Sequence, residues 1–235
     1  MRSQPRSDSA LMKYLKRTWL DPFHISHKTL ERGLARHSGQ IRGRVLDVGC
    51  GTKPYRRLFP AATQYYGTET HRTFTAGTQA DVTAFGEALP FRAGAFDGVV
   101  CTEVLEHVPE PADFLREMVR VLRPGGVLLL TTPQTWGLHE EPYDFYRYTK
   151  YGLQYLFGKA GLEMVEVAPT TGTLGTVGQR LSSFFYYRFG GRTRLLKPLA
   201  VMICAPIQIA FASADRLAGR HGDTINWIAL GRKPS

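Results

Sequence analysis

The chain has 235 residues, a net charge of +10, and 43% hydrophobic and 21% charged residues. This length suits one large domain, or one domain with an appendage, and the composition is that of a globular protein. Its three cysteines, Cys50, Cys101 and Cys204, are far apart and form no CxxC pair. Their spacing excludes a disulfide framework and a cysteine zinc site, and it favours a reducing, cytoplasmic compartment. No apolar segment follows the first basic residues, so no secretory signal is expected.

Positive charge is concentrated at the two ends of the chain. Residues 1–44 carry ten Lys or Arg against three Asp or Glu, and residues 170–235 carry nine against two. Residues 45–169 between them carry eleven against fifteen. Basic ends of this kind attract nucleic acid, an anionic membrane surface or an anionic substrate, and a solvated basic face is the alternative.

The first half of the chain predicts strands alternating with turns. Residues 1–10 are polar and are expected to be disordered, and residues 11–37 have a helical pattern interrupted at Asp21-Pro22. The run VLDVGCG predicts a buried strand closed by a glycine turn. Three further strand candidates follow, at residues 64–70, 78–82 and 95–103.

The second half alternates helices with strands. Pro111 suits the first position of a helix, which the sequence Arg123-Pro124-Gly125-Gly126 is expected to end. Further segments predict a strand at 127–133, a helix at 149–160, a strand at 162–169, helices within 173–222 and a strand at 224–233. This alternation predicts parallel βαβ units in a doubly wound α/β fold, with ligands bound beyond the carboxyl ends of the strands.

The first glycine turn discriminates between two classes of cofactor. Gly49 and Gly51 let the backbone approach a ligand closely, and Glu69 ends the next strand, where a carboxylate can accept hydrogen bonds from ribose hydroxyls. A dinucleotide site would need a third glycine at position 54, where this chain has Pro54. Asp47 suits a cation better than a diphosphate. The turn therefore favours S-adenosylmethionine over NAD.

Four segments, read together, resemble the type 11 group of class I S-adenosylmethionine-dependent methyltransferases. They are RVLDVGCGTKPYRRLF, YYGTE, EALPFRAGAFDGVVCTEVLEHVPEP and VLRPGGVLLLTTP, in the order and spacing of that family, and the resemblance covers about residues 42–169. It implies a seven-stranded, mostly parallel sheet with an antiparallel last strand. The expected domains are an N-terminal helical segment (1–41), the methyltransferase core (42–170), an apolar helical insertion (171–223) and a closing strand (224–235).

The resemblance also assigns cofactor-binding positions. It implies that Asp47, Gly49 and Gly51 hold the methionine end, with Cys50 as a further cofactor-binding position. It also implies that Glu69 binds ribose and that Thr102 and Glu103 line the cofactor and acceptor pocket. Relatives usually carry an adenine-binding Asp where this chain has Phe85, so Phe85, Asp81 or Glu87 is expected to replace that contact. The spacing of Glu103, Glu106 and His107 is not an established ligand pattern, and no metal is predicted.

A segment rich in polar and aromatic residues, Pro133 to Thr149, follows the fifth predicted strand. It resembles the LHExPxDxxRYT segment of one type 11 subgroup, which implies a sugar or glycolipid acceptor. His139 and His107 are the candidates for a general base, and Tyr146 and Arg147 are the candidates for acceptor positioning. A lid held by internal hydrogen bonds, without proton transfer, is the alternative.

The apolar run from Pro198 to Ala214 contains no charged residue. As a helix it would span roughly 26 Å, barely the thickness of a membrane core, and the last strand of the core follows it. We therefore expect a helix packed on the domain or on a second copy in a homodimer, or an in-plane helix in contact with a membrane through residues 195–217.

Together these patterns predict a methyltransferase that acts on a small-molecule, sugar or glycolipid acceptor. One alternative is a silent cofactor-binding scaffold, supported by Phe85. A second is a nucleic-acid methyltransferase, supported by the basic ends. Against the second, the chain reads Thr102-Glu103-Val104-Leu105 where base methylases usually carry an Asn/Asp-Pro-Pro-Tyr/Phe stretch.

Overall fold

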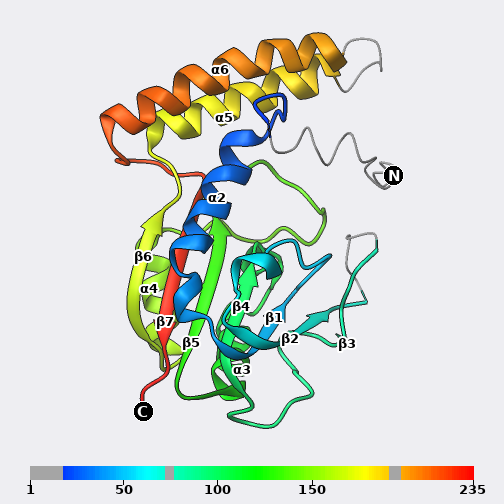
Figure 1. Ribbon diagram of the computed structural model, residues 1–235, viewed down its shortest axis with the longest axis vertical. Coiled ribbons are helices and arrows are strands. Elements are labelled where there is room, and N and C mark those ends of the chain that lie inside the picture. The colour runs from blue at the N-terminus through cyan, green and yellow to red at the C-terminus, as the bar shows by residue number, and fades with distance from the viewer. Residues whose placement is uncertain (1–17, 72–76, 191–196) are drawn as a thin grey trace. The chain divides into compact units, whose positions relative to one another are not determined.

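A seven-stranded sheet in the order β3-β2-β1-β4-β5-β7-β6 forms the centre of the fold (Figure 1). The structure is a computed structural model that describes residues 18–71, 77–190 and 197–235, so the predicted disorder of residues 1–10 lies outside the described residues. The strands are β1 (Gly43–Val48), β2 (Ala62–Glu69), β3 (Val82–Thr83), β4 (Phe96–Thr102), β5 (Leu122–Pro133), β6 (Glu163–Pro169) and β7 (Asn226–Arg232).

Strand directions follow the predicted doubly wound arrangement. The strand β1 pairs in parallel with β2 and β4, β2 with β3, and β4 with β5, and in these ladders Asp47 lies opposite Gly67 and Val100. The arrow of β7 runs against those of β5 and β6 in Figure 1. The predicted fold class, with its antiparallel last strand, is confirmed.

Five α-helices accompany the strands in the described part of the chain: α2 (His24–Arg36), α3 (Pro111–Val121), α4 (Lys150–Lys159), α5 (Thr173–Phe185) and α6 (Lys197–Ala218). Pro111 is the first residue of α3, as its fixed φ favours. The Thr149 side chain caps α4 by accepting a hydrogen bond from the Gly152 backbone. A π-helical turn, Tyr186–Gly190, continues α5.

Two strand boundaries differ from the prediction. The Arg123–Gly126 stretch was expected to end the helix and to precede a strand at 127–133. The helix α3 does end before it, at Val121, but the stretch itself belongs to β5. Its glycines pair with the end of the chain: Gly125 N–H donates to the Lys233 carbonyl, and Lys233 N–H donates to that of Gly126. A partner more than 100 residues away thus outweighs a local turn signal. The third strand has only two residues, Val82 and Thr83, instead of 78–82.

The main core lies between the sheet and the helices α3 and α4. Apolar side chains of α3 and α4 pack there against apolar residues of β4 and β5, and Phe114, Met118 and Phe157 are among the fully or almost fully buried ones. This packing holds the strands, so their carboxyl ends form a fixed frame for side chains.

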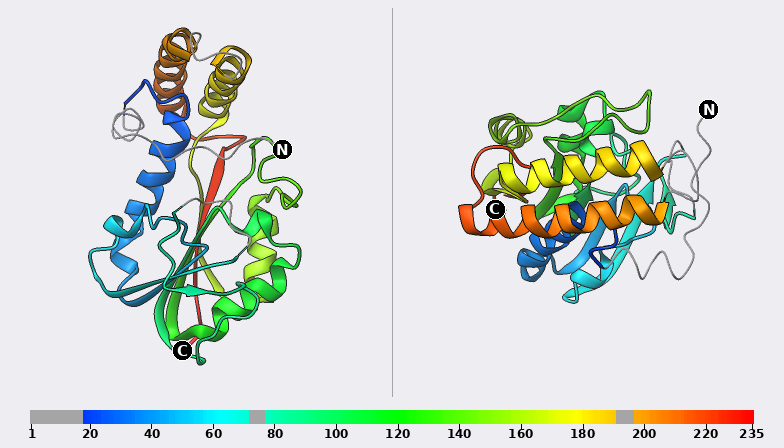
Figure 2. Two further views of the ribbon diagram at one scale, coloured as in Figure 1. Left: turned by 90° about the vertical axis from the view of Figure 1, so that its right-hand side faces the viewer. Right: turned by 90° about the horizontal axis from the view of Figure 1, so that it is seen from above.

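The chain divides into two compact units. One contains residues 33–168 and 227–235, and therefore most of the sheet. The other contains residues 1–32 and 169–226, in which α5 and α6 lie side by side as a hairpin (Figure 2). The predicted domain boundaries at 41, 170 and 223 stay a prediction.

Candidate active site

The turn after β1 has the backbone geometry that glycine permits. Gly49 has φ of 70° and Gly51 has φ of 49°, both in the left-handed region. A Cβ atom on Gly49 would lie 2.4 Å from Cγ2 of Val104, so no larger residue fits without displacing the loop after β4. This close approach keeps the ends of β1 and β4 together at the ligand-binding edge of the sheet.

Glu69 at the end of β2 is held rigidly beside this turn. Its Oε2 accepts a hydrogen bond of 3.0 Å from the Gly51 backbone, and its Oε1 accepts one of 3.0 Å from Thr70. Both oxygens keep further lone pairs for a ligand, because a carboxylate offers about four acceptor sites. The pairing of β1 with β2 therefore places a preoriented carboxylate at the edge where the sequence predicted one.

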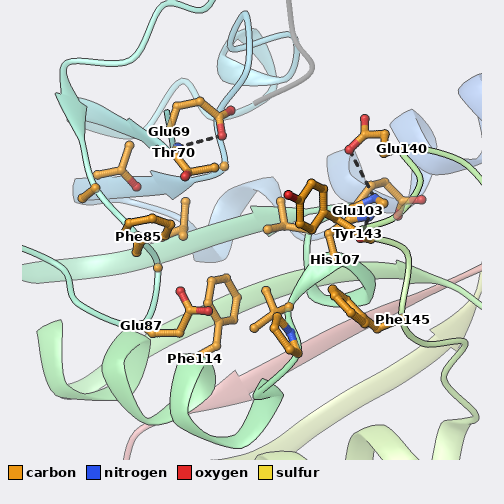
Figure 3. Close-up of a pocket in the computed structure, with 18 residues that line it drawn as sticks. Glu69, Thr70, Phe85, Glu87, Glu103, His107, Phe114, Glu140, Tyr143 and Phe145 are labelled. Atoms are coloured by element: carbon orange, nitrogen blue, oxygen red, sulfur yellow. Dashed lines mark hydrogen bonds and ion pairs between the residues drawn. The ribbon is translucent and has the colours of Figure 1, made fainter. Parts of the chain in front are cut away.

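A cavity of about 290 Å³ opens next to Glu69 (Figure 3). Its size is near the lower end for small-molecule sites. It lies wholly within the unit that holds the main core. The wall is formed by Val48, Gly49, Thr68, Glu69, Thr70, Ala84, Phe85, Gly86, Glu87, Glu103, Val104, His107, Val108, Pro109, Phe114, Glu140, Tyr143 and Phe145.

The cavity brings together about half of the predicted site residues. Six of them contribute to its wall: Gly49, Glu69, Phe85, Glu87, Glu103 and His107. Seven others lie outside the wall: Asp47, Cys50, Gly51, Thr102, His139, Tyr146 and Arg147. The catalytic and binding roles of all thirteen stay predictions.

Asp47 lies directly behind the glycine turn and is buried. Its Oδ2 accepts a hydrogen bond of 2.8 Å from the Tyr65 hydroxyl, and its Oδ1 has no hydrogen-bond partner among the described residues. Burial raises the pKa of Asp47 to about 7, and the hydrogen bond from Tyr65 only partly offsets that effect. Cys50 is also buried, and its thiol contacts the Gly51 carbonyl instead of the cavity.

Two of the three candidates for the adenine contact line the cavity. Phe85 is 40% exposed at the wall, and its ring meets that of His71 edge-on at 4.9 Å. Glu87 is an exposed carboxylate on the same wall. Asp81, by contrast, is bound by the Lys53 ammonium and the Gly67 backbone outside the wall.

The loop after β4 adds an acidic side chain to the opposite wall. Glu103 has φ of 54°, a strained value for a residue other than glycine, and its backbone N–H donates to the Thr131 carbonyl. Burial raises the pKa of Glu103 to about 7. The hydrogen bond to Thr131 holds this side chain at the carboxyl end of β4, where ligands bind in such sheets.

Three wall residues come from the segment after β5: Glu140, Tyr143 and Phe145. The sequence analysis singled out this segment but chose other members of it. Arg147 binds both oxygens of Asp144 at 2.7 Å, and the Tyr146 hydroxyl donates to the Pro109 carbonyl. Tyr146 and Arg147 thus hold the loop, while Glu140, Tyr143 and Phe145 reach the cavity.

Comparison with known proteins identifies a methyltransferase domain in this chain. A family model for a methyltransferase domain matches residues 46–130. A ubiquinone biosynthesis O-methyltransferase from Xanthomonas axonopodis pv. citri is 36% identical over 101 residues, or 38% of this chain and 42% of the relative. The protein of that name from Sodalis glossinidius is 33% identical over 132 residues, or 48% of this chain and 52% of the relative. The chain thus matches about half the length of these relatives or less.

Solved structures share the fold at low sequence identity. The cyclase SpnF has a TM-score of 0.56 and 21% identity, with 87% of this chain and 80% of that chain covered. Phosphoethanolamine N-methyltransferase 2 of Haemonchus contortus, in complex with S-adenosyl-L-methionine, has a TM-score of 0.58 and 14% identity, with 98% of this chain and 61% of that chain covered. One of these proteins is named a cyclase and the other a methyltransferase, so the shared fold alone does not define a reaction.

The strand order, the glycine turn and the family match all agree with the resemblance that the sequence predicted. Residues 46–130 match a methyltransferase domain, and the fold is that of the class I S-adenosylmethionine-dependent methyltransferases.

Proposed function

We propose that this chain binds S-adenosylmethionine in the cavity beside Glu69 and transfers its methyl group to a hydroxyl of a small, lipid-linked molecule. The observation that carries the proposal is the shared wall of Gly49 and Glu69, since it combines close backbone approach with a clamped carboxylate. The O-methyltransferase relatives support oxygen as the accepting atom.

The charges around the cavity fit this cofactor. Four carboxylates, those of Glu69, Glu87, Glu103 and Glu140, contribute to its wall, and no Lys or Arg does among the described residues. S-adenosylmethionine carries a positive sulfonium and a positive ammonium group, whereas a dinucleotide carries a negative diphosphate. An acidic wall therefore favours the sulfonium compound, and the exposed ring of Phe85 offers a surface for adenine.

The main catalytic task of this chain is to hold the acceptor close to the methyl group and in line with the bond that breaks. When bound, S-adenosylmethionine provides an activated methyl group on a good leaving group. Glu69 would accept hydrogen bonds from its ribose. Glu103 would stabilise positive charge from the facing wall, because a bound cation favours the ionised form of this carboxyl group. Of the two candidate bases, His107 reaches the cavity and His139 lies behind it, with ring centroids 4.8 Å apart. We propose that the hydroxyl proton leaves toward this histidine pair.

The polarity of the α5–α6 hairpin supports a lipid-linked acceptor. Its buried positions are small or polar, with Gln179, Ser182 and Gln208 fully inaccessible to solvent. Gln179 and Gln208 bind the backbone at the start of α2, where they accept from Ser26 and Ile25. Polar groups are thus satisfied inside this unit, as between helices that pack in a membrane.

Most of the exposed positions of the same hairpin are apolar. Phe184 of α5 is 60% exposed, and Met202 and Leu217 of α6 are 69% and 90% exposed. The exposed apolar residues of the two helices are Leu174, Val177, Leu181, Phe184, Leu199, Met202, Ile209 and Leu217. Residues 198–218 are long and apolar enough to cross a membrane, and only 22% of their most apolar window is buried. Exposure of this extent marks an interaction surface.

Charge indicates that this surface meets anionic lipid in the plane of the membrane. Residues 173–214 contain five Lys or Arg and no Asp or Glu. Arg180 is exposed near the middle of α5, which opposes burial of that helix in the hydrocarbon core and suits the headgroup region. We propose that the hairpin holds the enzyme at the bilayer from which it takes its acceptor.

Calorimetry with S-adenosylmethionine and with its demethylated product tests cofactor binding. The wild-type chain should bind both, and Glu69→Ala should bind at least tenfold more weakly, since both ribose hydroxyls lose their acceptor. Glu163→Ala, which removes a carboxylate from outside the cavity, is the matched control and should bind like the wild type. Absence of binding by the wild-type chain at millimolar ligand would refute the proposal.

A further inference from the structure

Glu106 lies beside the cavity, and one of its buried carboxylate oxygens has no hydrogen-bond partner among the described residues. The side chain is inaccessible to solvent, and its Oε2 accepts a hydrogen bond of 3.2 Å from the Thr132 hydroxyl. Its Oε1 has no hydrogen-bond partner in the described part of the chain. A buried carboxylate oxygen in that state is costly unless a cation or a donor completes it.

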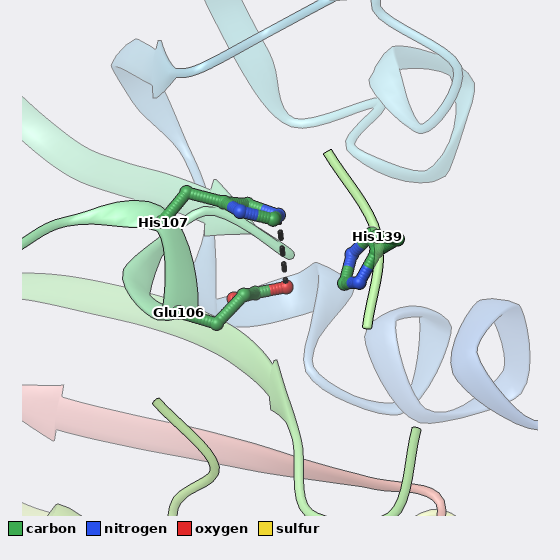
Figure 4. Close-up of side chains that lie close together, drawn as sticks. All are labelled: Glu106, His107 and His139. Carbon is green, nitrogen blue, oxygen red and sulfur yellow. Dashed lines mark ion pairs between the residues drawn. The ribbon is translucent and has the colours of Figure 1, made fainter. Parts of the chain in front are cut away.

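Two histidines converge on this oxygen (Figure 4). The Nε2 atom of His107 lies 3.8 Å from Oε1 of Glu106, and the His139 ring completes the group from the loop after β5. One potential ligand atom from each of the three residues lies within 4.8 Å of the others. The ligand atoms are thus a carboxylate oxygen and two imidazole nitrogens.

Each histidine is held by its other nitrogen. The Nδ1 atom of His107 lies 2.7 Å from the Tyr143 carbonyl, and Nδ1 of His139 lies 3.2 Å from both the Gly137 carbonyl and Oδ2 of Asp144. Carbonyl and carboxylate acceptors require Nδ1 to carry the proton, so in the neutral imidazole Nε2 has the lone pair that a metal ion would bind. This is how metal-binding histidines are oriented, with a carbonyl or a carboxylate behind the ring.

The charges nearby leave room for a cation. Oε2 of Glu140 lies 3.6 Å from Nε2 of His107, so this nitrogen faces two carboxylates. Arg147, the positive side chain nearest in sequence to the loop histidine, is occupied by both oxygens of Asp144. Where both carboxyl groups are ionised they repel this lone pair, and a cation placed between them would remove the repulsion.

Distance decides between a shared proton and a metal ion. The separations of 3.6 and 3.8 Å from His107 to its two carboxylates are too long for hydrogen bonds. A metal ion with bonds of about 2.1 Å separates its ligand atoms by about 3 to 4 Å, and side-chain shifts of about 1 to 2 Å in total close the widest gap of 4.8 Å. The spacing therefore matches a metal ion better than a proton.

We infer that Glu106, His107 and His139 form a binding site for a divalent first-row transition metal ion, with Glu140 as a further ligand. Mixed imidazole and carboxylate ligands suit Mn²⁺, Fe²⁺, Co²⁺ or Zn²⁺, whereas Mg²⁺ prefers oxygen ligands alone. Because His107 and Glu140 also line the cavity, the metal ion would stabilise an acceptor hydroxyl as its oxygen anion. With the metal ion bound, both imidazole nitrogens are ligands, so the hydroxyl proton leaves to solvent and the metal ion replaces the histidine pair in activating the hydroxyl. That role rests on the proposed function, but the site itself does not.

Metal titration of the purified chain tests the site without any cofactor. After chelator treatment, Co²⁺ should bind with one-to-one stoichiometry, give a visible d–d absorption band, and be displaced by Zn²⁺. His139→Asn and Glu106→Gln should each weaken Co²⁺ binding at least tenfold, the lower bound for loss of a ligand's support. Mg²⁺ should bind far more weakly than Zn²⁺.

The control and a second measurement keep the outcomes distinct. His221→Asn removes an exposed histidine from the other unit and should bind Co²⁺ like the wild type. His139 is partly exposed, so His139→Asn should keep a cooperative thermal transition, which is checked beside each titration. Equal Co²⁺ affinity of wild type and folded His139→Asn would overturn the site. Calorimetry with S-adenosylmethionine in chelator reports separately on the proposed cofactor binding.

Discussion

Burial and pairing give two carboxylates of this chain opposite acidities. Burial raises the pKa of Asp47 to about 7, because the surrounding strands exclude water from its charge. Burial alone would also raise the pKa of Asp144, but hydrogen bonds from the Arg147 side chain and the His139 backbone lower it to about 2. Near neutral pH, Asp144 is a fixed negative charge that orients His139, whereas Asp47 is close to its titration point.

The pKa of Asp47 predicts a pH-dependent stability. The folded chain keeps this proton up to about pH 7, while the unfolded chain releases it near pH 3.8. The free energy of unfolding therefore falls as the pH rises from about 4 to about 7. The stabilisation that the proton on Asp47 provides is complete only below about pH 4. Asp47→Asn removes the titration, so its stability relative to wild type should rise by roughly 2 to 3 kcal/mol between pH 5 and pH 8.

Urea unfolding at pH 5 and pH 8 measures this difference. Glu163→Gln, at an exposed carboxylate, is the control and should follow the wild type at both values. A stability difference between Asp47→Asn and wild type that stays constant with pH would show that Asp47 keeps an ordinary acidity in the folded chain.

The sequence predicts the place of some residues in the site but not of others. Glu69 was predictable, because parallel strands align their carboxyl ends and the residue ending the second strand must lie near the glycine turn. The group of Glu106, His107 and His139 was not, and the sequence analysis predicted no metal. His139 joins its two partners only through the path of the loop after β5, which no local spacing encodes.

At the scale of elements, periodicity located helices and strands, and long-range pairing set their ends. The spacing of apolar residues predicted α3 and α4 nearly to the residue. The start of β5 was wrong because pairing with Lys233 is invisible in a local window. For α5 and α6, composition predicted apolar helices, but only the structure separates a buried face with Gln179 and Gln208 from an exposed apolar face.

Vesicle flotation tests that exposed face. The wild-type chain should float with vesicles rich in phosphatidylglycerol, and less with pure phosphatidylcholine or at high salt, because basic residues contribute to the attraction. Phe184→Gln combined with Met202→Gln removes two of the more exposed apolar side chains of the hairpin and should reduce the bound fraction at least fivefold.

The matched control changes two exposed aromatic residues outside the hairpin. Tyr151→Gln with Tyr155→Gln alters α4, whose residues belong to the other unit, and should float like the wild type. Equal flotation of the hairpin variant and the wild type would contradict the membrane contact, and binding to nucleic acid instead would assign the basic ends a different partner.

At the scale of the whole molecule, one unit combines residues 1–32 with residues 169–226, and the second of these segments lies between β6 and β7 of the sheet in the sequence. The chain leaves the sheet after β6 and returns at β7, and the two crossing points are adjacent, since Thr170 N–H donates to the Asn226 carbonyl at 2.9 Å. Each residue that lines the cavity belongs to the sheet unit. The cavity and the exposed apolar surface therefore belong to different units, so cofactor binding and membrane contact can be tested separately.

Removal of the hairpin should leave cofactor binding intact. In a variant with residues 28–171 joined to 223–235 by four Gly and Ser residues, the short loop costs little entropy because the crossing points are neighbours. We expect S-adenosylmethionine affinity within threefold of wild type by calorimetry, no flotation with anionic vesicles, and slower methylation of an acceptor presented in vesicles than of the same headgroup free in solution. If the variant unfolds cooperatively yet no longer binds the cofactor, the hairpin contributes to the cavity, and the separation of the two functions is wrong.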